Sequence, residues 1–327
     1  MAMRAIRVKQ FGGPEVLQLE ESVAVPIPSD TQVLVQVRAA GINPVDTYIR
    51  SGTYQMTNLP YTPGRDGAGI IKKVGSKTTK FKPGDRVYFL FNASGSYAQY
   101  VAVEEGMVGH LADYLTLEQG AAIGIPYYTA FRALSIKARD KFKAGNTVLV
   151  HGASGAVGLA SVQFAVSRGL TVYGTAGSQE GIHLVLEHGA TAVYNHREEG
   201  YIDKMKAAMN GSGPDIIVEM LANVNLATDM TLVNRNGIIV VVGCRGNVEV
   251  NPRLAMQKEF IVTGFALPNA AQGEWTEMHE LMAEGMQQQW VQPHISKIYS
   301  MHEAPQAHEN IIKTKAALGK IILKVEN

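Results

Sequence analysis

Thr147-Val148-Leu149-Val150-His151-Gly152-Ala153-Ser154-Gly155-Ala156-Val157-Gly158 is the stretch of sequence that decides the fold of this chain. Its first four residues are apolar or β-branched, which predicts a buried parallel strand. A glycine-rich turn follows, after which residues 159–167 are predicted to form a helix and residues 170–175 a further strand. This order of strand, turn, helix and strand is the context that a dinucleotide-binding turn requires.

The glycines of this turn have distinct expected roles. Gly155 lets the backbone approach a pyrophosphate, and Gly158 lets the helix pack closely on the strand. The helix N-terminus offers unpaired N–H groups and the positive end of the helix dipole to phosphates. Ala153 stands where the usual fingerprint has its first glycine. Since strand-to-helix turns in any α/β protein favour glycine, a purely structural turn is the alternative interpretation.

The end of the second strand bears on which dinucleotide is bound. An NAD site needs an acidic residue there to hold the ribose 2′-hydroxyl. Residues 173–178 contain no acid, and the first carboxylate is that of Glu180. The sequence therefore favours NADPH, although no Arg or Lys follows in this loop to bind the 2′-phosphate. The nearest basic side chains are those of His183, His196 and Arg197.

The composition is that of an intracellular enzyme. The chain has 327 residues, 46% hydrophobic and 18% charged, enough to bury two cores of ordinary domain size. A formal net charge of +1 argues against a protein dominated by nucleic-acid binding. Cys244 is the only cysteine, which excludes an internal disulfide and any multi-cysteine zinc site. With no apolar run near the ~20 residues of a membrane span and no signal segment, the expected location is the cytoplasm.

The pattern of predicted elements changes along the chain. Residues 1–122 are expected to be β-rich, with strands at 4–8, 31–38 and 86–91. The alternation that follows, up to residue 265, predicts a doubly wound parallel sheet. Its expected strands are 147–150, 171–173, 192–195, 216–219, 238–243 and 261–265. After an amphipathic stretch at 275–287, a last strand at 320–325 is expected to return to the first domain.

Three motifs outside the nucleotide turn carry a family resemblance. They are residues 40–46 (AGINPVD), 63–69 (PGRDGAG) and 82–87 (KPGDRV). With them the chain resembles the medium-chain dehydrogenase/reductase superfamily nearly from end to end. The resemblance implies an α/β fold of two domains. One is a GroES-like, β-rich catalytic domain, residues 1–122 completed by 268–327, and the other is a Rossmann NADP-binding domain, residues 123–267.

A closer likeness is to the zinc-free quinone oxidoreductases of the zeta-crystallin type. It rests on residues 48–54 (YIRSGTY), 119–126, 151–155, 219–225 (EMLANVN) and 307–311. Zinc-dependent members need soft or borderline ligands where this chain has Asn43 and Arg65, and an amide and a guanidinium cannot make that site. His279 and Glu280 begin like a metalloprotease helix, but residue 283 is alanine instead of the second histidine. No metal is expected.

Without a metal, the chemistry must come from the nicotinamide and from polar side chains beside the substrate. Asn43, Asp46 and Tyr48 are the candidate catalytic residues, on the loop that faces the nicotinamide in the resembling family. Tyr48 can donate from its phenol and Asn43 from its amide, and Tyr48 matches a cofactor-contacting tyrosine of that subfamily. The alternative is a plain turn at Asn43 and a packing aromatic at Tyr48. Arg50 and Tyr54 are expected on the surface, with the cleft as the alternative.

The resemblance also implies the cofactor contacts. The segment from Ser154 to Val157 would wrap the pyrophosphate, and Gly177 and His196 would lie by the adenosine phosphate, His196 as a charged partner. Val242 and Phe265 fit core positions nearly as well, and Cys244 is interpreted as a small filler because no local base would activate it. The expected cofactor residues are Tyr48, Ser154, Gly155, Ala156, Val157, Gly158, Gly177, His196, Asn225, Val242, Gly243, Cys244, Arg245, Phe265, Ala266 and Leu267.

The leading functional hypothesis is NADPH-dependent reduction of quinones. The resemblance implies a preference for ortho-quinones and one-electron transfer that releases a semiquinone. One alternative is NADPH-dependent reduction of an enone or 2-enoyl thioester, which the same fold supports. Another is binding of AU-rich RNA as a second role, for which residues 137–143 (KARDKFK) supply basic side chains around one aromatic, although such a run is more often a solvated surface. A homodimer or homotetramer is the expected assembly.

Overall fold

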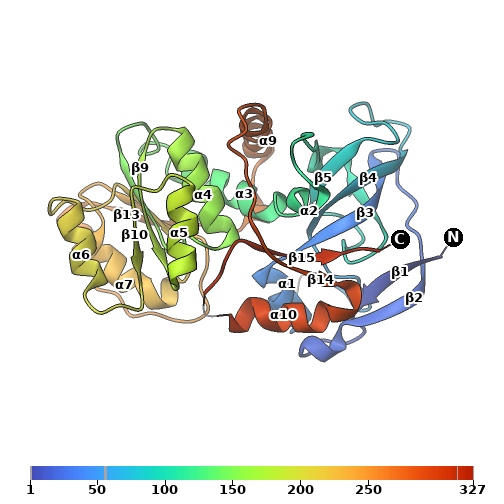
Figure 1. Cartoon of the computed structure of the whole chain (residues 1–327), viewed down its shortest axis with the longest axis horizontal. Coiled ribbons are helices and arrows are strands. Elements are labelled where there is room, and N and C mark those ends of the chain that lie inside the picture. Colours follow the sequence, from blue (N-terminus) through green and yellow to red (C-terminus); the bar gives the residue numbers. More distant parts are fainter. Residues whose placement is uncertain (1, 55–56, 315, 327) are drawn as a thin grey trace. The chain divides into compact units, whose positions relative to one another are not determined.

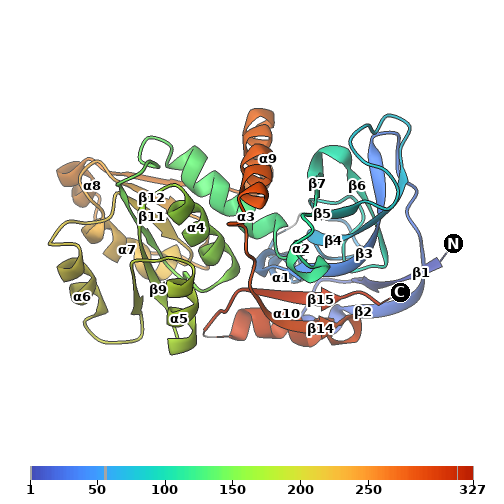
Figure 2. The same cartoon turned by 45° about the horizontal axis from the view of Figure 1, so that its top comes forward.

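The computed structural model describes residues 2–54, 57–314 and 316–326 (Figures 1 and 2). The chain divides into two compact units. The first contains Met1–Ile125, Pro293–Thr314 and Gly319–Asn327, and the second contains Pro126–Gln292 and Lys315–Leu318. Among the described residues, no helix is both long and apolar enough to span a bilayer.

The first unit is built on a seven-stranded sheet of order β14-β15-β3-β4-β5-β7, with β6 also paired to β3. A separate antiparallel pair is formed by β1 (Ala2–Arg7) and β2 (Gln18–Ala24). The sheet strands are β3 (Gln32–Ile42), β4 (Asp66–Val74), β5 (Arg86–Leu90), β6 (Tyr100–Glu104), β7 (Val108–His110), β14 (Ile295–Ser300) and β15 (Lys320–Lys324). Its α-helices are α1 (Pro44–Arg50), α2 (Leu117–Gly120) and α10 (Ala304–Lys313).

Strand β3 is the centre of the first unit. Val33, Val35 and Val37 are fully buried in its main hydrophobic cluster, as expected for β-branched residues on the inner face of a sheet. β15 pairs antiparallel with β3, with Ile321 opposite Ile42. The last strand therefore returns to the first unit, as the sequence predicts, and places Lys320 beside the end of β3.

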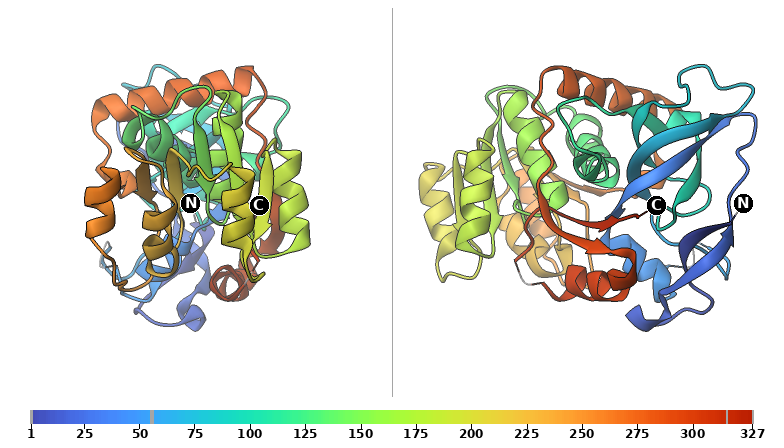
Figure 3. Two further views of the ribbon diagram at one scale, coloured as in Figure 1. Left: turned by 90° about the vertical axis from the view of Figure 1, so that its left-hand side faces the viewer. Right: turned by 45° about the vertical axis from the view of Figure 1, so that its right-hand side comes forward.

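The second unit holds six strands in the order β10-β9-β8-β11-β12-β13, each paired parallel to its neighbours. Helices lie on both faces of this sheet (Figure 3). The strands are β8 (Thr147–Val150), β9 (Thr171–Ala176), β10 (Ala192–Asn195), β11 (Ile216–Glu219), β12 (Ile238–Val241) and β13 (Ile261–Gly264). The helices are α3 (Gly124–Phe131), whose first residues belong to the first unit, α4 (Ala156–Ser167), α5 (Gln179–Glu187), α6 (Tyr201–Ala208), α7 (Ala222–Leu232), α8 (Arg253–Lys258) and α9 (Gln272–Gln287).

This strand order confirms the doubly wound sheet. The chain moves outward from β8 through β9 to β10 and then crosses to β11 on the other side of β8. In open parallel sheets ligands bind outside the carboxyl ends of the strands at such a reversal. The positions directly at this point are His151, which follows β8, and Glu219, the last residue of β11.

Two features differ from the sequence expectation. α4 begins at Ala156 instead of residue 159, since the helix starts directly at the glycine turn. Residues 268–292, expected to complete the first domain, cluster with the second unit. The contacts of α9 explain this, because Glu274 pairs with Arg132 at 2.8 Å and the Nδ1 atom of His279 lies 2.5 Å from the Tyr128 hydroxyl.

Candidate active site

The turn after β8 is fixed by hydrogen bonds to the end of β9. The Gly152 N–H donates to the Thr175 hydroxyl at 3.1 Å, and the Ala153 N–H donates to the Thr175 carbonyl at 2.8 Å. Gly152 has φ +57°, in the left-handed region that glycine adopts without penalty. The turn ends at Gly155, the N-cap of α4.

Gly158 and Gly155 differ in what the fold demands of them. A Cβ at Gly158 would lie 2.4 Å from the Gly152 carbonyl oxygen, so glycine is required for α4 to pack against the turn, as predicted. A Cβ at Gly155 would meet only ordinary contacts, the nearest at 3.4 Å. Since the protein itself leaves room at Gly155, a glycine there keeps space open for a bound group.

Ala153 replaces the first glycine of the fingerprint without a clash. A Cβ added at Gly174 on β9 would lie 2.9 Å from the Ala153 methyl group. The absence of a side chain at Gly174 therefore makes room for Ala153. The missing glycine of the turn is compensated on the neighbouring strand.

The end of β9 is free of acidic side chains. Gly177 is buried, and Ser178 caps α5 by accepting a hydrogen bond from the Gly181 N–H at 3.2 Å. The His196 N–H donates to the Ala176 carbonyl at 3.1 Å, which places His196 beside this strand end as expected. Partial burial, with the charges of Arg197 and His151, lowers the pKa of His196 from 6.5. These surroundings favour the neutral imidazole of His196.

These loops fit the pyrophosphate and 2′-phosphate of NADPH. The space at Gly155 lies next to the first N–H groups of α4, at Ala156 and Val157, which is the arrangement that suits a phosphate at a helix N-terminus. Ser154, in the same turn, donates its hydroxyl to the Ala317 carbonyl at 2.6 Å. No carboxylate at residues 173–178 would repel a 2′-phosphate.

The expected cofactor residues after β12 lie on a loop that is half-buried at Val242 and Gly243 and exposed at Cys244 and Arg245. The Gly243 carbonyl accepts from the Ala222 N–H at 2.9 Å, and a Cβ at Gly243 would lie 2.4 Å from the Met220 carbonyl oxygen. Arg245 donates its N–H to the Asn223 side chain at 2.8 Å. Cys244 is exposed, with its thiol 3.0 Å from the Gly246 carbonyl oxygen. Its interpretation as a small filler is therefore wrong.

The expected residues after β13 are held by Arg132, which the sequence did not single out. Its guanidinium lies 5.3 Å from the centre of the Phe265 ring and donates to the Ala266 carbonyl at 2.7 Å. Arg132 is only 4% exposed, and Glu274 on α9 balances its charge. A buried arginine within an apolar helical segment was the available signal, but its partners are more than 130 positions away.

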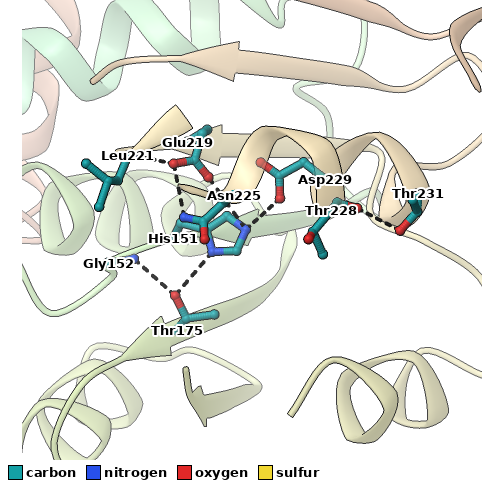
Figure 4. A network of polar contacts seen from close by, with 9 residues as sticks. All are labelled: His151, Gly152, Thr175, Glu219, Leu221, Asn225, Thr228, Asp229 and Thr231. Atoms are coloured by element: carbon teal, nitrogen blue, oxygen red, sulfur yellow. Dashed lines mark hydrogen bonds and ion pairs between the residues drawn. The ribbon is translucent and has the colours of Figure 1, made fainter. Parts of the chain in front are cut away.

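A buried polar cluster joins the strand ends of the second unit (Figure 4). We call His151, Thr175, Glu219 and Asp229 the His151 cluster. The Nε2 atom of His151 lies 2.8 Å from Asp229 Oδ1 and 3.7 Å from Glu219 Oε2. Its Nδ1 atom lies 3.3 Å from the Thr175 hydroxyl. Glu219 also accepts a hydrogen bond from Asn225 at 3.2 Å, so one expected cofactor residue is tied to this cluster.

In the first unit, Asn43 and Asp46 form a capping box at the start of α1. Asp46 Oδ2 accepts from the Asn43 backbone N–H at 2.9 Å and from its side-chain amide at 3.3 Å. The same amide donates to Asp66 at 2.8 Å, and Lys320 donates to both Asn43 Oδ1 and Asp66. These four residues, the Asn43 network, are all at most 3% exposed. Both amide hydrogens of Asn43 are thus engaged by carboxylates.

The charges of the Asn43 network act on Asp46. Burial, together with the neighbouring Asp66 carboxylate, raises the pKa of Asp46 to about 6. Asp66 and Lys320 were not singled out in the sequence. Their signal was present in part, because Asp66 lies in the motif at 63–69, but Lys320 is 277 positions from Asn43.

Tyr48 lies on the half-buried face of α1. Its ring meets that of Tyr54 edge-on with centroids 5.4 Å apart, and its carbonyl accepts from the Tyr54 N–H. Arg50 is 7% exposed, with its guanidinium 3.3 Å from the Nδ1 atom of His308 and 3.2 Å from the Gly12 carbonyl oxygen. The expectation that Arg50 is a surface residue is therefore wrong, because it ties α1 to α10.

Arg65, at an expected non-zinc position, and the basic run at 137–143 both have contacts within the protein. Arg65 lies over the Phe91 ring at 5.7 Å, and among the described residues the only metal-like group of His and carboxylates is the one at His151. In the run 137–143, Phe142 packs against the Phe164 ring at 4.7 Å, and Arg139 is paired with Glu277. The aromatic on which a nucleic-acid base would stack is thus already packed.

Comparisons with known proteins agree with this geometry. Residues 29–127 match the family described as alcohol dehydrogenase GroES-like domain, and residues 156–284 match zinc-binding dehydrogenase. Over 322 residues the chain is 51% identical to a human (Homo sapiens) quinone oxidoreductase and 50% identical to that of Sus scrofa, covering 98% of this chain and 97% of each relative. The crystal structure of Escherichia coli quinone oxidoreductase complexed with NADPH superposes with a TM-score of 0.88 at 30% identity, covering 98% of this chain and 99% of that one.

Proposed function

Because this chain belongs to the zeta-crystallin type of quinone oxidoreductases within the medium-chain dehydrogenase/reductase superfamily, we propose that it catalyses the NADPH-dependent reduction of quinones. The observation that carries the proposal is the nucleotide turn of the second unit. Its first helical N–H groups are open to a pyrophosphate, and the neighbouring strand end lacks the acid that would select NAD. The E. coli structure supports the same nucleotide.

When bound, the reduced nicotinamide supplies the reducing equivalents. The residues of the chain bind and orient the partners. In this proposal Gly155, Ala156 and Val157 hold the pyrophosphate, and Gly177 and His196 bind the 2′-phosphate. Arrival of that phosphate would raise the pKa of His196 and restore its charge, since an opposite charge favours the protonated imidazole.

We assign the hydrogen bond to the quinone oxygen to Tyr48. Its phenol is half-buried and matches the cofactor-contacting tyrosine of the subfamily. Asn43 and Asp46 position Tyr48 indirectly, because their capping box fixes the start of the helix that carries it. A preference for ortho-quinones and a one-electron course belong to the proposal as well, and rest on the subfamily alone.

A steady-state panel tests the proposal directly. Ortho-quinones, para-quinones, enones, 2-enoyl thioesters and alcohols are compared with NADPH and with NADH. We expect turnover with quinones and NADPH. Higher specificity constants for an enone or an enoyl thioester would favour the sister reductase activity, and equal constants for the two nucleotides would contradict the nucleotide assignment.

Assembly and location complete the proposal. β13 is an edge strand of its sheet, with Ile261 56% and Val262 43% exposed. Uncovered apolar edge strands pair readily with other chains, which supports a homodimer or homotetramer. Sedimentation of the wild type and of Ile261→Lys tests this, and a monomeric wild type would contradict it.

A lone, exposed cysteine fits a reducing cytoplasm. AU-rich RNA binding is the least supported part, because Phe142 of the basic run packs against Phe164 and Arg139 pairs with Glu277.

A further inference from the structure

The His151 cluster ties together three strand ends that carry nucleotide loops. His151 follows β8, Thr175 is near the end of β9, and Glu219 ends β11. Asp229 approaches from α7, and in Figure 4 the imidazole lies between Thr175 on one side and the two carboxylates on the other. His151, Glu219 and Asp229 are at most 3% exposed. None of them is solvated, so the cluster acts through its neighbours.

Its contacts lead directly to the backbone of two loops. On one side the Thr175 hydroxyl links His151 Nδ1 to the Gly152 N–H, the first residue of the phosphate turn. On the other side Glu219 Oε1 accepts from the Leu221 N–H and from the Asn225 side chain. A single imidazole with its carboxylates therefore sets both the turn at 152–155 and the segment at 221–225.

Among the ion pairs of the described residues, the group that faces both carboxylates of the cluster is the imidazole of His151. Among the described residues, no hydrogen-bond donor reaches Glu219 Oε2 or Asp229 Oδ2. Burial, offset in part by His151 and reinforced by Asp229, raises the pKa of Glu219 to about 7. Burial alone would lower the pKa of His151, but the hydrogen bond to Asp229 and the two carboxylates raise it above 6.5. The cluster thus retains at least one proton near neutral pH.

We propose that His151 is a positioning residue for the nucleotide: held between Thr175 and the carboxylates of Asp229 and Glu219, it keeps the turn at 152–155 and the segment at 221–225 in the geometry that binds NADPH. The proposal rests on the proposed function, since it assumes that NADPH binds at this turn. A metal ion is the less favoured occupant. The 2.8 Å separation of His151 Nε2 and Asp229 Oδ1 is that of a hydrogen bond, so a proton already lies between them.

The proposal predicts how affinity depends on pH. As the pH rises through about 7, Glu219 loses its proton and the cluster becomes more negative beneath the phosphate turn. NADPH affinity should therefore fall with rising pH. Two other titratable groups face the cluster. His196 lies on the loop after β10, and Tyr201 is the first residue of α6. Tyr201 stays protonated, because burial and the two carboxylates raise its pKa. His196 is removed from the profile with the variant His196→Gln.

The test measures the NADPH dissociation constant by fluorescence titration between pH 6 and 9, with turnover at saturating NADPH measured in parallel. We expect His151→Gln to raise the dissociation constant about tenfold while turnover changes little, because one buried hydrogen-bonding partner is lost. Glu219→Gln should remove the fall in affinity above pH 7. Glu284→Gln, which takes one carboxylate from an ion pair with Arg168 in the same unit, is the matched control and should leave the profile unchanged.

A second pair of variants keeps the test informative where a cluster variant fails to fold. Thr175→Val removes the hydroxyl that links His151 to Gly152, and Thr175→Ser retains it. We expect weaker NADPH binding in Thr175→Val and near-wild-type binding in Thr175→Ser. Equal affinities for NADPH across all these variants, or losses confined to turnover, would overturn the proposal. So would a stoichiometric metal ion held by the three residues. A wild-type protein that does not bind NADPH would instead contradict the proposed function.

Discussion

The Asn43 network of the first unit and the His151 cluster of the second differ in how they balance buried charge. Both set two carboxylates beside a nitrogen base and an uncharged polar side chain. In the Asn43 network the nitrogen group is the ammonium of Lys320, which contacts Asp66. In the His151 cluster the base is an imidazole, and two carboxylate oxygens have no hydrogen-bond donor among the described residues. The first network therefore sets a lysine ammonium against its carboxylates, whereas the nitrogen group of the second is an imidazole that itself gains and loses a proton near neutral pH.

The largest expected effect comes from removing the ammonium of Lys320. Lys320→Met leaves the buried carboxylate of Asp66 without the ammonium that contacts it, and breaking a buried pair in this way costs about 3–5 kcal/mol. We expect this loss in the free energy of unfolding, measured by urea denaturation. Lys313→Met breaks an exposed ion pair with Glu309 and should change stability by less than ~1 kcal/mol. Equal effects of the two variants would mean that the Asn43 network does not depend on its cation.

The next effect is a pH dependence of stability set by Asp46. Its pKa rises from 3.8 to about 6 in the folded state, so between those values the folded state binds more protons than the unfolded state. By linkage, its contribution to stability is present below pH 4 and is lost as the pH rises to about 6, by roughly 3 kcal/mol. Asp46→Asn should therefore gain stability relative to the wild type at pH 7 compared with pH 4. The difference in unfolding free energy at the two values measures this, and an unchanged difference would place the shift elsewhere.

Gly177→Asp tests the acid-free strand end that borders the His151 cluster. A carboxylate there would repel a 2′-phosphate and could hold a ribose hydroxyl instead. We expect kcat/KM for NADPH to fall about thirtyfold, close to 2 kcal/mol, and that for NADH to fall less. Gly177→Asn has nearly the same volume without the charge, and separates repulsion from crowding at this buried position. A similar loss with both variants and both nucleotides would mean that the loop is only structural.

The sequence predicted the backbone of the nucleotide unit well, because its signals are local. Apolar runs marked β8, β10 and β11 to the residue, and the space left at Gly155 accords with its predicted role. The partners of Arg132 and Lys320 could not be predicted, since they lie more than 130 positions away. Arg50 was misplaced on the surface for the same reason, because its burial depends on His308 of α10.

A smaller effect is expected at Tyr48, which is half-buried on α1, the helix that the Asn43 network caps. Tyr48→Phe removes one neutral hydrogen bond, worth about 1 kcal/mol, and should lower turnover with quinones several-fold without changing the fold. A loss of a hundredfold or more would show that the phenol acts mainly in the transition state. Asn43→Ala is the comparison, because its amide is engaged by Asp46 and Asp66 and its loss should lower stability more than turnover. Wild-type kinetics in both variants would mean that this loop has no part in the reaction.

The smallest expected effect is that of metal removal. It tests the region around Asn43 and Arg65 in the first unit and the His151 cluster in the second. By the family resemblance, Asn43 and Arg65 stand where zinc-dependent members have metal ligands. In this structure Asn43 is engaged by carboxylates, and Arg65 lies over the Phe91 ring. Neither an amide nor a guanidinium provides the thiolate or imidazole that zinc requires. We therefore expect dialysis against a strong chelator to leave activity with quinones unchanged. Elemental analysis before and after dialysis completes the measurement. Zinc lost together with activity would contradict the argument from Asn43 and Arg65. A metal present in the wild type and absent from His151→Gln would identify the His151 cluster as its site. The metal would then take the place of the proton between His151 Nε2 and Asp229 Oδ1.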